Sequence, residues 1–274
     1  MLSVLIPARN EAYLARTIAD VLENARGNVE VIAVCDGYEP DLSVIRDARL
    51  LVVHHARAEG MRQSINEAAS IATGGHLMKL DAHCMMAPGF DVTLTAHLDD
   101  NWVVTPMRYG FDPVTWTRDN VGIGAHYLTY PEHSDQRKAG LHARHWKQRA
   151  EARAGVWLDD DMSFQGSCWC MSRTHWDRLG GLSVEGYGPF IQEPQEIGLK
   201  TWLGGGRVKI HRGTWYAHWR KREGQGYVLS PRQSREGLLY STDYWMHDRW
   251  PERVHDMRWL IEQFSPVPGW PETW

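Results

Sequence analysis

The stretch EGMRQSINEAASIATGGHLMKLDAHC (residues 59–84) predicts a helix that leads directly into a buried strand. Over 59–73 the apolar residues recur on one helical stripe, and two glycines end the pattern. Residues 76–81 (HLMKLD) then form a short strand, with the polar Asp81 and His83 at its carboxyl end. A helix followed by such a strand is the repeating unit of α/β folds.

The N-terminal residues continue the same alternation. Short apolar runs predict strands at 2–7, 29–37 and 49–54. Between the first two runs, Asn10 is expected to cap a helix. Strands that alternate with helices favour right-handed crossovers and a mainly parallel sheet flanked by helices. Neither GxGxxG nor GxxxxGK(S/T) occurs after the first strand, which excludes a dinucleotide fingerprint and a P-loop.

The second half of the chain has a weaker pattern. Beyond residue 108 polar and aromatic residues alternate without a clear period. Strand-like order returns at 164–171, and a helix is expected after Glu193, with Pro194 in its first turn. The sequence contains no Pro/Ser-rich linker and no internal repeat, so we expect one continuous domain over residues 1–274.

The composition is typical of a folded, water-soluble protein. The 274 residues carry a net charge of −4 and are 43% hydrophobic, which excludes a disordered, collagenous or coiled-coil chain. No window approaches the roughly 18 consecutive apolar residues of a membrane span, and the first residues, MLSVLIPARNE, lack the basic start and apolar run of a signal peptide. We therefore expect a cytoplasmic protein. Four cysteines without a CxxC pair favour neither a disulfide scaffold nor a zinc site.

Three loops at one edge of the predicted sheet form the expected ligand site. Ligands bind outside the carboxyl ends of parallel strands, where residues 8–11, 36–37 and 81–83 fall. Residues i and i+2 of an extended chain point the same way, so the Asp81 carboxylate and the His83 imidazole face one spot. This pair suits a divalent ion such as Mn²⁺, whose open positions would hold a diphosphate. In the alternative interpretation, Asp81 caps the next turn and His83 is a partly buried polar residue.

Several segments resemble the polypeptide N-acetylgalactosaminyltransferases, which are GT-A enzymes related to the family-two glycosyltransferases. In that family an Arg-containing helix leads into a strand that ends D-(S/A)-H-C, and residues 59–84 match this with LDAHC. The other matching segments are FQGSCWCMSRTHWDRLG (164–180), EPQEIGLKTWLGGG (193–206), YAHWRK (216–221) and YWMHD (244–248). The resemblance covers roughly residues 1–250.

The resemblance implies a GT-A fold and the metal-dependent transfer of a hexosyl or N-acetylhexosaminyl group from a UDP-sugar to a hydroxyl. It assigns Mn²⁺, or another divalent cation, to Asp81, His83 and His218. The Asp36 carboxylate suits the uracil imide N–H, and Arg62 resembles the arginine that reaches the base or the phosphates. The expected donor-binding residues are Pro7, Ala8, Arg9, Glu11, Asp36, Arg62, Asp81 and Ala82.

The same resemblance divides the chain by function. Residues 1–107 are expected to bind the nucleotide-sugar, and residues 108–250 the acceptor, with the metal-ligand histidine in this second part. Residues 251–274 form a C-terminal tail. The lectin domain, stem and membrane anchor of the family are expected to be missing, because the catalytic fold begins at the first residue.

Two acidic residues are the catalytic candidates. Glu193 resembles the family's acidic residue that contacts the donor sugar or the acceptor, and such a residue can deprotonate a hydroxyl. Asp161, in the acidic cluster 159–161, is the second candidate, with a solvated turn as its alternative. Residues 166–167 (Gly-Ser) replace a Gly-Gly of the family, and 190–192 (Phe-Ile-Gln) replace a Trp-Gly-Gly. These departures leave the sugar and the acceptor open. The stereochemistry stays open as well, because the retaining relatives have no firmly placed nucleophile.

Two basic stretches indicate the acceptor. Residues 137–153 hold six Lys/Arg, and residues 212–222 hold four Lys/Arg among aromatic residues. Cations interleaved with aromatics can track phosphates and stack on bases, which favours hydroxymethylated pyrimidines in DNA as the acceptor, as for phage-type transferases in a host cytoplasm. A solvated helix and a lid over the UDP pyrophosphate are the alternatives for the two stretches. The expected acceptor-binding residues are Arg144, Lys147, Trp215, Trp219 and Arg220.

Other acceptors and other classes of protein also fit the sequence. The hydroxyl could belong to Ser/Thr of a polypeptide or to a cell-surface glycan. A catalytically inactive GT-A-fold module that binds nucleic acid or sugar, and a nucleotidyltransferase, are the alternatives of another class. The intact Asp81, His83 and His218 argue against an inactive module, and the downstream segments favour sugar transfer over nucleotidyl transfer.

Overall fold

The computed structural model describes residues 1–132, 138–221 and 226–272. The strands are β1 (Leu2–Ala8), β2 (Val29–Asp36), β3 (Leu50–His55), β4 (His76–Leu80), β5 (Cys84–Met86), β6 (Trp102–Tyr109), β7 (Phe111–Asp112), β8 (Thr117–Arg118), β9 (His126–Leu128), β10 (Ala143–His145), β11 (Leu158–Asp160), β12 (Cys168–Ser172) and β13 (Arg207–His218). The helices are α1 (Leu14–Asn24), α2 (Met61–Ile71), α3 (Phe90–Thr95), α4 (Lys147–Ala152), α5 (Arg173–Leu179), α6 (Glu193–Leu203), α7 (Pro231–Met246) and α8 (Met257–Phe264).

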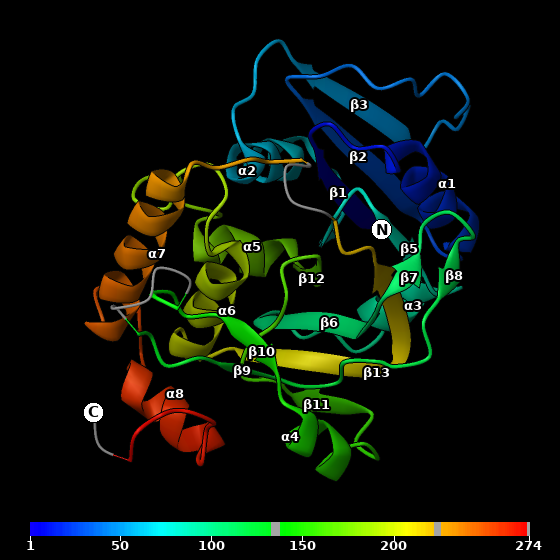
Figure 1. Cartoon of the computed structure of the whole chain (residues 1–274). Helices are drawn as coiled ribbons and strands as arrows, with labels where there is room; N and C mark the ends of the chain where they lie inside the picture. Colours follow the sequence, from blue (N-terminus) through cyan, green and yellow to red (C-terminus); the bar gives the residue numbers. More distant parts are fainter. Residues whose placement is uncertain (133–137, 222–225, 273–274) are drawn as a thin grey trace.

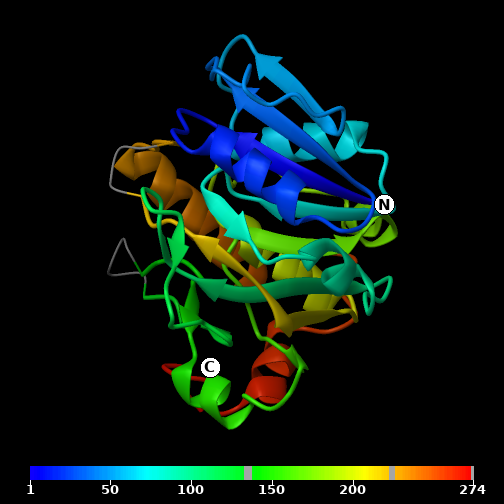
Figure 2. The ribbon, with the colours of Figure 1, turned by 90° about the vertical axis from the view of Figure 1, so that its right-hand side faces the viewer.

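A nine-stranded sheet forms the centre of the described residues (Figure 1). Its strands run in the order β11-β13-β6-β12-β4-β1-β2-β3, and β5 pairs with β13. The four strands at one end, β4-β1-β2-β3, are all parallel. Every residue of β1 is buried, because alternate side chains face two different cores. Leu5 packs with α2, whereas Val4 and Ile6 pack with α1 on the opposite face (Figure 2).

The second half of the chain makes the sheet mixed. β12 pairs antiparallel with both β4 and β6, and β13 is parallel to β6 but antiparallel to β11 and β5. The expected parallel pairing therefore holds for the first four strands, and the predicted α/β architecture is confirmed. The mixed part matters for the site, because β5 and β13 bring residues near 83 and 218 to the same edge.

Two local predictions differ from the structure. Asn10 does not cap α1: the N-cap is Tyr13, without a side-chain cap hydrogen bond, and Asn10 has a positive φ of 51° in the preceding turn. The strand expected at 164–171 begins only at Cys168. Residues 164–167 instead form a connection, of which Gln165, Gly166 and Ser167 line a cavity. The polar side chains of Gln165 and Ser167 therefore interrupt the apolar pattern.

The C-terminal residues pack onto the body of the fold. In α8, Phe264 lies edge-on to Trp202 of α6, with ring centroids 5.4 Å apart, and Arg149 of α4 lies 4.9 Å above the Phe264 ring. Both views place α8 beside α4 and far from the N-terminus (Figures 1 and 2). Among the described residues, no helix has the length and apolar character needed to cross a bilayer.

Candidate functional site

Asp81, His83 and His218 converge at the carboxyl edge of the sheet. Asp81 and His83 lie in the turn after β4, and His218 is the last residue of β13, directly opposite Cys84 in the β5–β13 ladder. The Nε2 atom of His218 lies 3.0 Å from Oδ2 of Asp81 and 3.0 Å from Nε2 of His83. Oδ2 of Asp81 and Nε2 of His83 are 3.8 Å apart. One carboxylate and two imidazoles thus face a common point.

This donor set fits a divalent cation. Nδ1 of His83 lies 3.2 Å from Oε2 of Glu11, and Nε2 of the same ring faces the other two groups. Burial lowers the pKa of His218 to about 4, despite the opposing hydrogen bond to Asp81, so its imidazole is neutral at pH 7. Neutral imidazoles and a carboxylate are ligands for ions such as Mn²⁺ and Zn²⁺. Among the described residues, these three form the one such cluster.

A buried lysine controls the charge of Asp81. Lys79 of β4 is 1% exposed, and its Nζ donates to Oδ1 of Asp81 and to the carbonyl oxygen of Gly166, at 2.5 Å each. Burial alone would raise the pKa of the Asp81 carboxyl, but the Lys79 ammonium and the His218 hydrogen bond hold it well below its usual range. Asp81 is therefore a carboxylate whose Oδ1 is occupied by Lys79 and whose Oδ2 faces the imidazoles.

Glu193 lies on the other side of Lys79. It is the first residue of α6, is 2% exposed, and its Oε2 is 4.0 Å from Nζ of Lys79. Nε1 of the buried Trp169 donates to its Oε1. Burial raises the pKa of the Glu193 carboxyl, and the Lys79 charge and the Trp169 hydrogen bond counteract this only in part. A carboxyl group with a raised pKa in a cavity is suited to proton exchange with a substrate.

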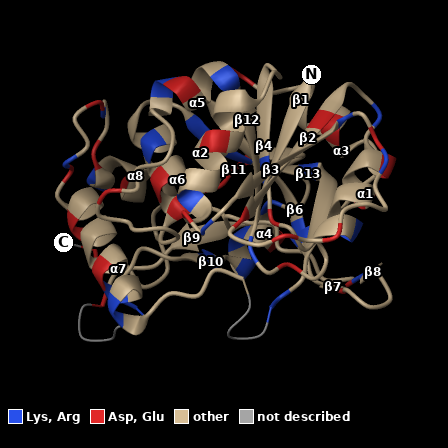
Figure 3. Cartoon of the chain, turned by 90° about the horizontal axis from the view of Figure 1, so that it is seen from above, with Lys and Arg blue, Asp and Glu red and all other residues tan. Residues whose placement is uncertain are grey.

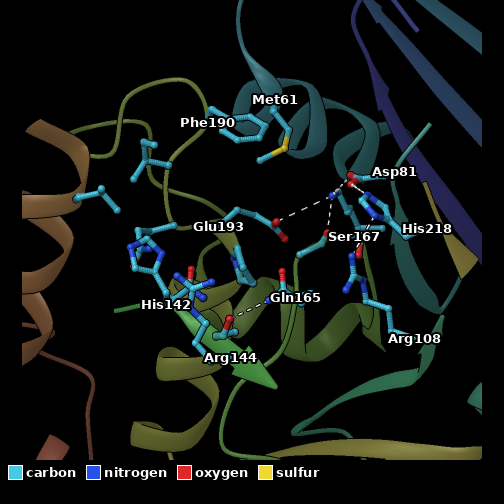
Figure 4. A pocket seen from close by; sticks show the side chains of 18 residues that line it. Met61, Asp81, Arg108, His142, Arg144, Gln165, Ser167, Phe190, Glu193 and His218 are labelled. Carbon is cyan, nitrogen blue, oxygen red and sulfur yellow. Dashed lines mark hydrogen bonds and ion pairs between the residues drawn. The ribbon is translucent and has the colours of Figure 1, made fainter. Parts of the chain in front are cut away.

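Two cavities meet at this cluster. A cavity of about 420 Å³ extends from Asp81 and His218 past Glu193 to His142 and Arg144 (Figure 4). A smaller cavity of about 220 Å³ lies on the side of the first strand. The smaller cavity is lined by Pro7, Glu11, Met61, Asp81, His83, Phe190, His218, Arg220, Lys221 and Tyr227.

Several expected donor-binding residues lie at these cavities. Pro7 and Glu11 line the smaller one, and Glu11 is ion-paired with Lys221 as well as close to His83. Ala8 and Ala82 are buried beside the cluster without facing either cavity. Arg9 donates to the backbone carbonyl of Asp36, at 3.0 Å.

Asp36 and Arg62 do not have the roles that the sequence suggested. The buried Asp36 carboxylate accepts hydrogen bonds from the backbone N–H groups of Glu59 and Gly60 and from Nδ1 of His55. It fixes the turn before α2, so it is occupied by the protein itself. The expectation failed because a carboxylate at a strand end can serve a neighbouring turn as well as a ligand.

Arg62 points into the protein interior. Its guanidinium is fully buried, pairs with Glu196 of α6, and donates to the backbone carbonyls of Ser183 and Ile191. It also lies 4.1 Å above the Tyr187 ring. These contacts satisfy the guanidinium internally, so Arg62 joins α2 to the second half of the fold and does not face a nucleotide.

Asp161 is also absent from the cavities. Its buried carboxylate accepts from the backbone N–H of His126 at 2.6 Å and lies 2.8 Å from Nδ1 of the same residue. Its backbone carbonyl accepts from Nε1 of Trp202. Asp161 anchors β9 to the sheet, which corrects its assignment as a catalytic candidate. Of the two catalytic candidates, Glu193 is the one that lines the larger cavity.

The expected acceptor residues are spread over different regions. Arg144 lines the larger cavity and Arg220 the smaller one, and the Trp219 ring lies 6.3 Å from that of His83. Lys147 is exposed on α4 and pairs with Glu151 at 3.8 Å. Trp215 packs against Tyr109, away from both cavities.

Much of the basic stretch 137–153 is neutralised by its surroundings. Arg153 pairs with Asp159 at 2.7 Å, and Lys138 pairs with Glu132 at 3.1 Å. Arg149 donates to the backbone carbonyl of Asp160. Acidic segments accordingly lie among basic ones around α4 (Figure 3). Residue 137 lies outside the described residues. A continuous phosphate-binding stripe is therefore not present along the part of this stretch that is described.

Sequence reasoning assigned no role to several polar residues of the larger cavity. Among them are Lys79, Arg108, His142, Gln165 and Gln195. Nη2 of Arg108 lies 3.3 Å from Nδ1 of His218, and Gln165 donates to the backbone carbonyl of Ala143 at 2.8 Å. A signal was available for Lys79, because a lysine in an apolar strand two residues before Asp81 must share the face of Asp81.

Comparison with known proteins places this chain and its fold in a defined class. The chain belongs to glycosyl transferase family 2, whose model matches residues 3–179. A curated relative named "Putative polypeptide N-acetylgalactosaminyltransferase 13", from Drosophila melanogaster, is 25% identical over 290 residues, which cover 95% of this chain and 48% of the relative.

Solved structures share the fold. The crystal structure of GalNAc-T7 with UDP, GalNAc and Mn²⁺ matches with a TM-score of 0.73 and 20% identity, over 90% of this chain and 49% of that one. S. aureus TarS 1-349 matches with a TM-score of 0.54 and 14% identity, over 80% of this chain and 60% of that one. The predicted GT-A fold is thereby confirmed. The chain spans about half the length of the N-acetylgalactosaminyltransferase relatives.

Proposed function

We propose that the protein transfers a sugar from a UDP-sugar to an acceptor hydroxyl, with a divalent cation such as Mn²⁺ held by Asp81, His83 and His218. The observation that carries this proposal is the convergence of these three groups between two cavities, one of which contains Glu193. The glycosyl transferase family and the GalNAc-T7 structure with UDP and Mn²⁺ support the same conclusion.

The protein's own residues prepare the cation site. When bound, the cation would act as a Lewis acid that offsets the negative charge of the leaving diphosphate. Glu11 holds the His83 ring and Lys79 holds the Asp81 carboxylate, so that the three ligand atoms face one point. Arg220 and Lys221 line the smaller cavity and add positive charge where the diphosphate would lie.

Glu193 is the group we assign to the acceptor hydroxyl. It faces the larger cavity beside the cation site, and its burial raises the pKa of its carboxyl. In its ionised form it accepts a hydrogen bond from the hydroxyl and orients it for attack, and it can take the proton as the new glycosidic bond forms. The Lys79 ammonium, 4.0 Å from Oε2 of Glu193, lines the same cavity and attracts this carboxylate in its ionised form.

For the acceptor, a polypeptide Ser/Thr hydroxyl has better support than a base in DNA. The relative named as a polypeptide N-acetylgalactosaminyltransferase favours it. Duplex DNA binding requires several phosphate contacts, whereas most described cations of 137–153 are paired internally. Hydroxymethylated DNA therefore enters the test as a rival acceptor.

The test is a donor-by-acceptor screen that measures UDP release and product mass together. We expect Mn²⁺-dependent transfer from a UDP-sugar, with UDP-GalNAc and UDP-glucose tried first, to Ser/Thr peptides. The Glu193→Gln variant should lose transfer by orders of magnitude, whereas Glu236→Gln, on the exposed face of α7, should not. Faster turnover with GDP- or ADP-sugars, or transfer to hydroxymethylated DNA in preference to peptides, would contradict the proposal.

A further inference from the structure

A third cavity, of about 340 Å³, continues the larger one away from the cation site. It is lined by Tyr127, Thr129, Tyr130, Glu132, Lys138, His142, Arg144, Pro268 and Gly269. His142 and Arg144 line both cavities, and they lie on the opposite side of Glu193 from Asp81 and His218 (Figure 4). The site therefore extends from the cation cluster past Glu193 to a volume of the size that holds a small ligand.

The walls of this third cavity are aromatic and firmly held. The Tyr130 ring lies edge-on to Trp270, with centroids 5.2 Å apart, and Nε1 of Trp270 donates to the backbone carbonyl of Leu128 at 2.6 Å. Tyr127 packs against Trp146, with centroids 5.8 Å apart. Aromatic rings fixed in this way offer contact area to a ligand at a low cost in side-chain entropy.

Arg144 is the uncompensated charge between the two cavities. Its side chain is exposed, and within 1–132, 138–221 and 226–272 it makes no hydrogen bond or ion pair. By contrast, the Lys138 ammonium is already paired with Glu132. The strand that carries Arg144 is fixed by pairing with Tyr127 in β9 and by the Gln165 hydrogen bond to Ala143. A positioned, unpaired guanidinium is suited to a carboxylate, which it can bind through two parallel hydrogen bonds.

We propose that this third cavity is a subsite for an acidic residue of an extended polypeptide acceptor. The carboxylate of that residue would bind Arg144 while the target Ser/Thr hydroxyl of the same polypeptide lies at Glu193. This inference rests on the proposed function and names a substrate feature within it. Among the described residues that line this third cavity, Arg144 is the one Lys or Arg without an acidic partner, which favours one carboxylate over a nucleic acid, because phosphate chains are bound by several cations. The tyrosine rings and Thr129 would contact the neighbouring peptide residues.

The test uses a peptide library with a central Thr and random flanking residues, incubated with the full chain, UDP-sugar and Mn²⁺. Sequencing of the glycosylated fraction should show Asp/Glu enriched at one position on one side of the Thr, by about fivefold. The Arg144→Gln variant should lose this enrichment, and Arg144→Lys should retain part of it. Arg232→Gln, which alters an exposed arginine on α7 paired with Glu236, should retain it in full.

The outcomes separate the inference from the function on which it rests. Glycosylated peptides without acidic enrichment, or with an enrichment that survives Arg144→Gln, would overturn the subsite and leave peptide transfer standing. Mn²⁺-dependent UDP release without any peptide product would overturn the polypeptide acceptor and the subsite together. If Arg144→Gln does not fold, a Glu-to-Gln replacement in the best peptide tests the wild-type protein directly: a kcat/KM unchanged by that replacement would overturn the subsite.

Discussion

The Lys79 ammonium lies 2.5 Å from Oδ1 of Asp81 and 4.0 Å from Oε2 of Glu193. The buried Lys79 ammonium thus lies between Asp81, the proposed metal ligand, and Glu193, the proposed acceptor-binding carboxyl. Because Oδ1 of Asp81 is occupied by this contact, Oδ2 is the oxygen that faces His83 and His218. Lys79 is therefore a positioning residue for both sides of the site.

We expect Lys79→Met to raise the Mn²⁺ concentration needed for half-maximal transfer by about 10–100-fold, because loss of the group that orients a metal ligand typically lowers metal affinity by this factor. The measurement is the Mn²⁺ concentration at half-maximal transfer, together with kcat. Lys79→Arg should restore part of the loss, and Lys209→Met, which removes a lysine paired with Asp160 away from the site, should have no such effect. An unchanged Mn²⁺ titration for Lys79→Met would argue against this role.

Gly166 lies directly against the Glu193 carboxylate. A Cβ added at residue 166 would overlap Oε2 of Glu193 and approach the Pro194 ring to 3.1 Å. We expect Gly166→Ala to displace Glu193 and reduce kcat by about 100-fold with the fold retained, because small misplacements of a reacting group cost about that much. Gly155→Ala, where nothing lies near the added Cβ, is the matched control. Equal activity of the two variants would show that the position of Glu193 is not critical.

Arg62 is expected to matter for stability and not for the donor. Lys200 is the other cation paired with Glu196, and Arg62→Met leaves that buried carboxylate with Lys200 and the backbone N–H of Ser183 as its partners among the described residues. Breaking one partner of a buried ion pair typically costs about 3–5 kcal/mol, so the free energy of unfolding in denaturant should fall by about this amount. The affinity of the folded variant for UDP should stay at the wild-type value. A large loss of UDP affinity without loss of stability would restore Arg62 to the nucleotide site.

His175 makes stability depend on pH. Burial lowers the pKa of its imidazole to about 4, compared with about 6.5 in the unfolded chain. Between these values the unfolded chain binds more protons, so stability falls as the pH falls from about 6.5 to 4, by roughly 3 kcal/mol in total. His175→Gln, which can keep the hydrogen bond to Thr201, should have a flatter profile of unfolding free energy against pH. Parallel profiles for the two proteins would contradict this assignment.

Local parts of the fold and site are predictable from the sequence. The strand before Asp81 follows from the apolar run at 76–80, and His83 lies near Asp81 because the two residues are only two positions apart in the turn after that strand. The helix after Glu193 follows from its proline start and glycine end, and the structure has it at Glu193–Leu203.

Long-range contacts were not predictable from spacing or periodicity. His218 lies 135 residues from His83, and its place in the site came from a resemblance between segments and not from spacing. Asp36 and Arg62 were misassigned because their partners, Gly60 and Glu196, lie 24 and 134 residues away. In the sequence alone, a polar residue that pairs with a buried neighbour looks the same as a polar residue that binds a ligand.

The central claim is that Asp81, His83 and His218 hold a cation through which UDP binds. Isothermal titration of UDP in the presence and absence of Mn²⁺ tests it most directly, with wild type, His218→Ala and, as the control, His247→Ala at the exposed end of α7. We predict that Mn²⁺ increases the UDP affinity of wild type and His247→Ala by about tenfold or more, and that His218→Ala loses this increase. Equal UDP affinity with and without Mn²⁺ in the wild-type protein would contradict the account.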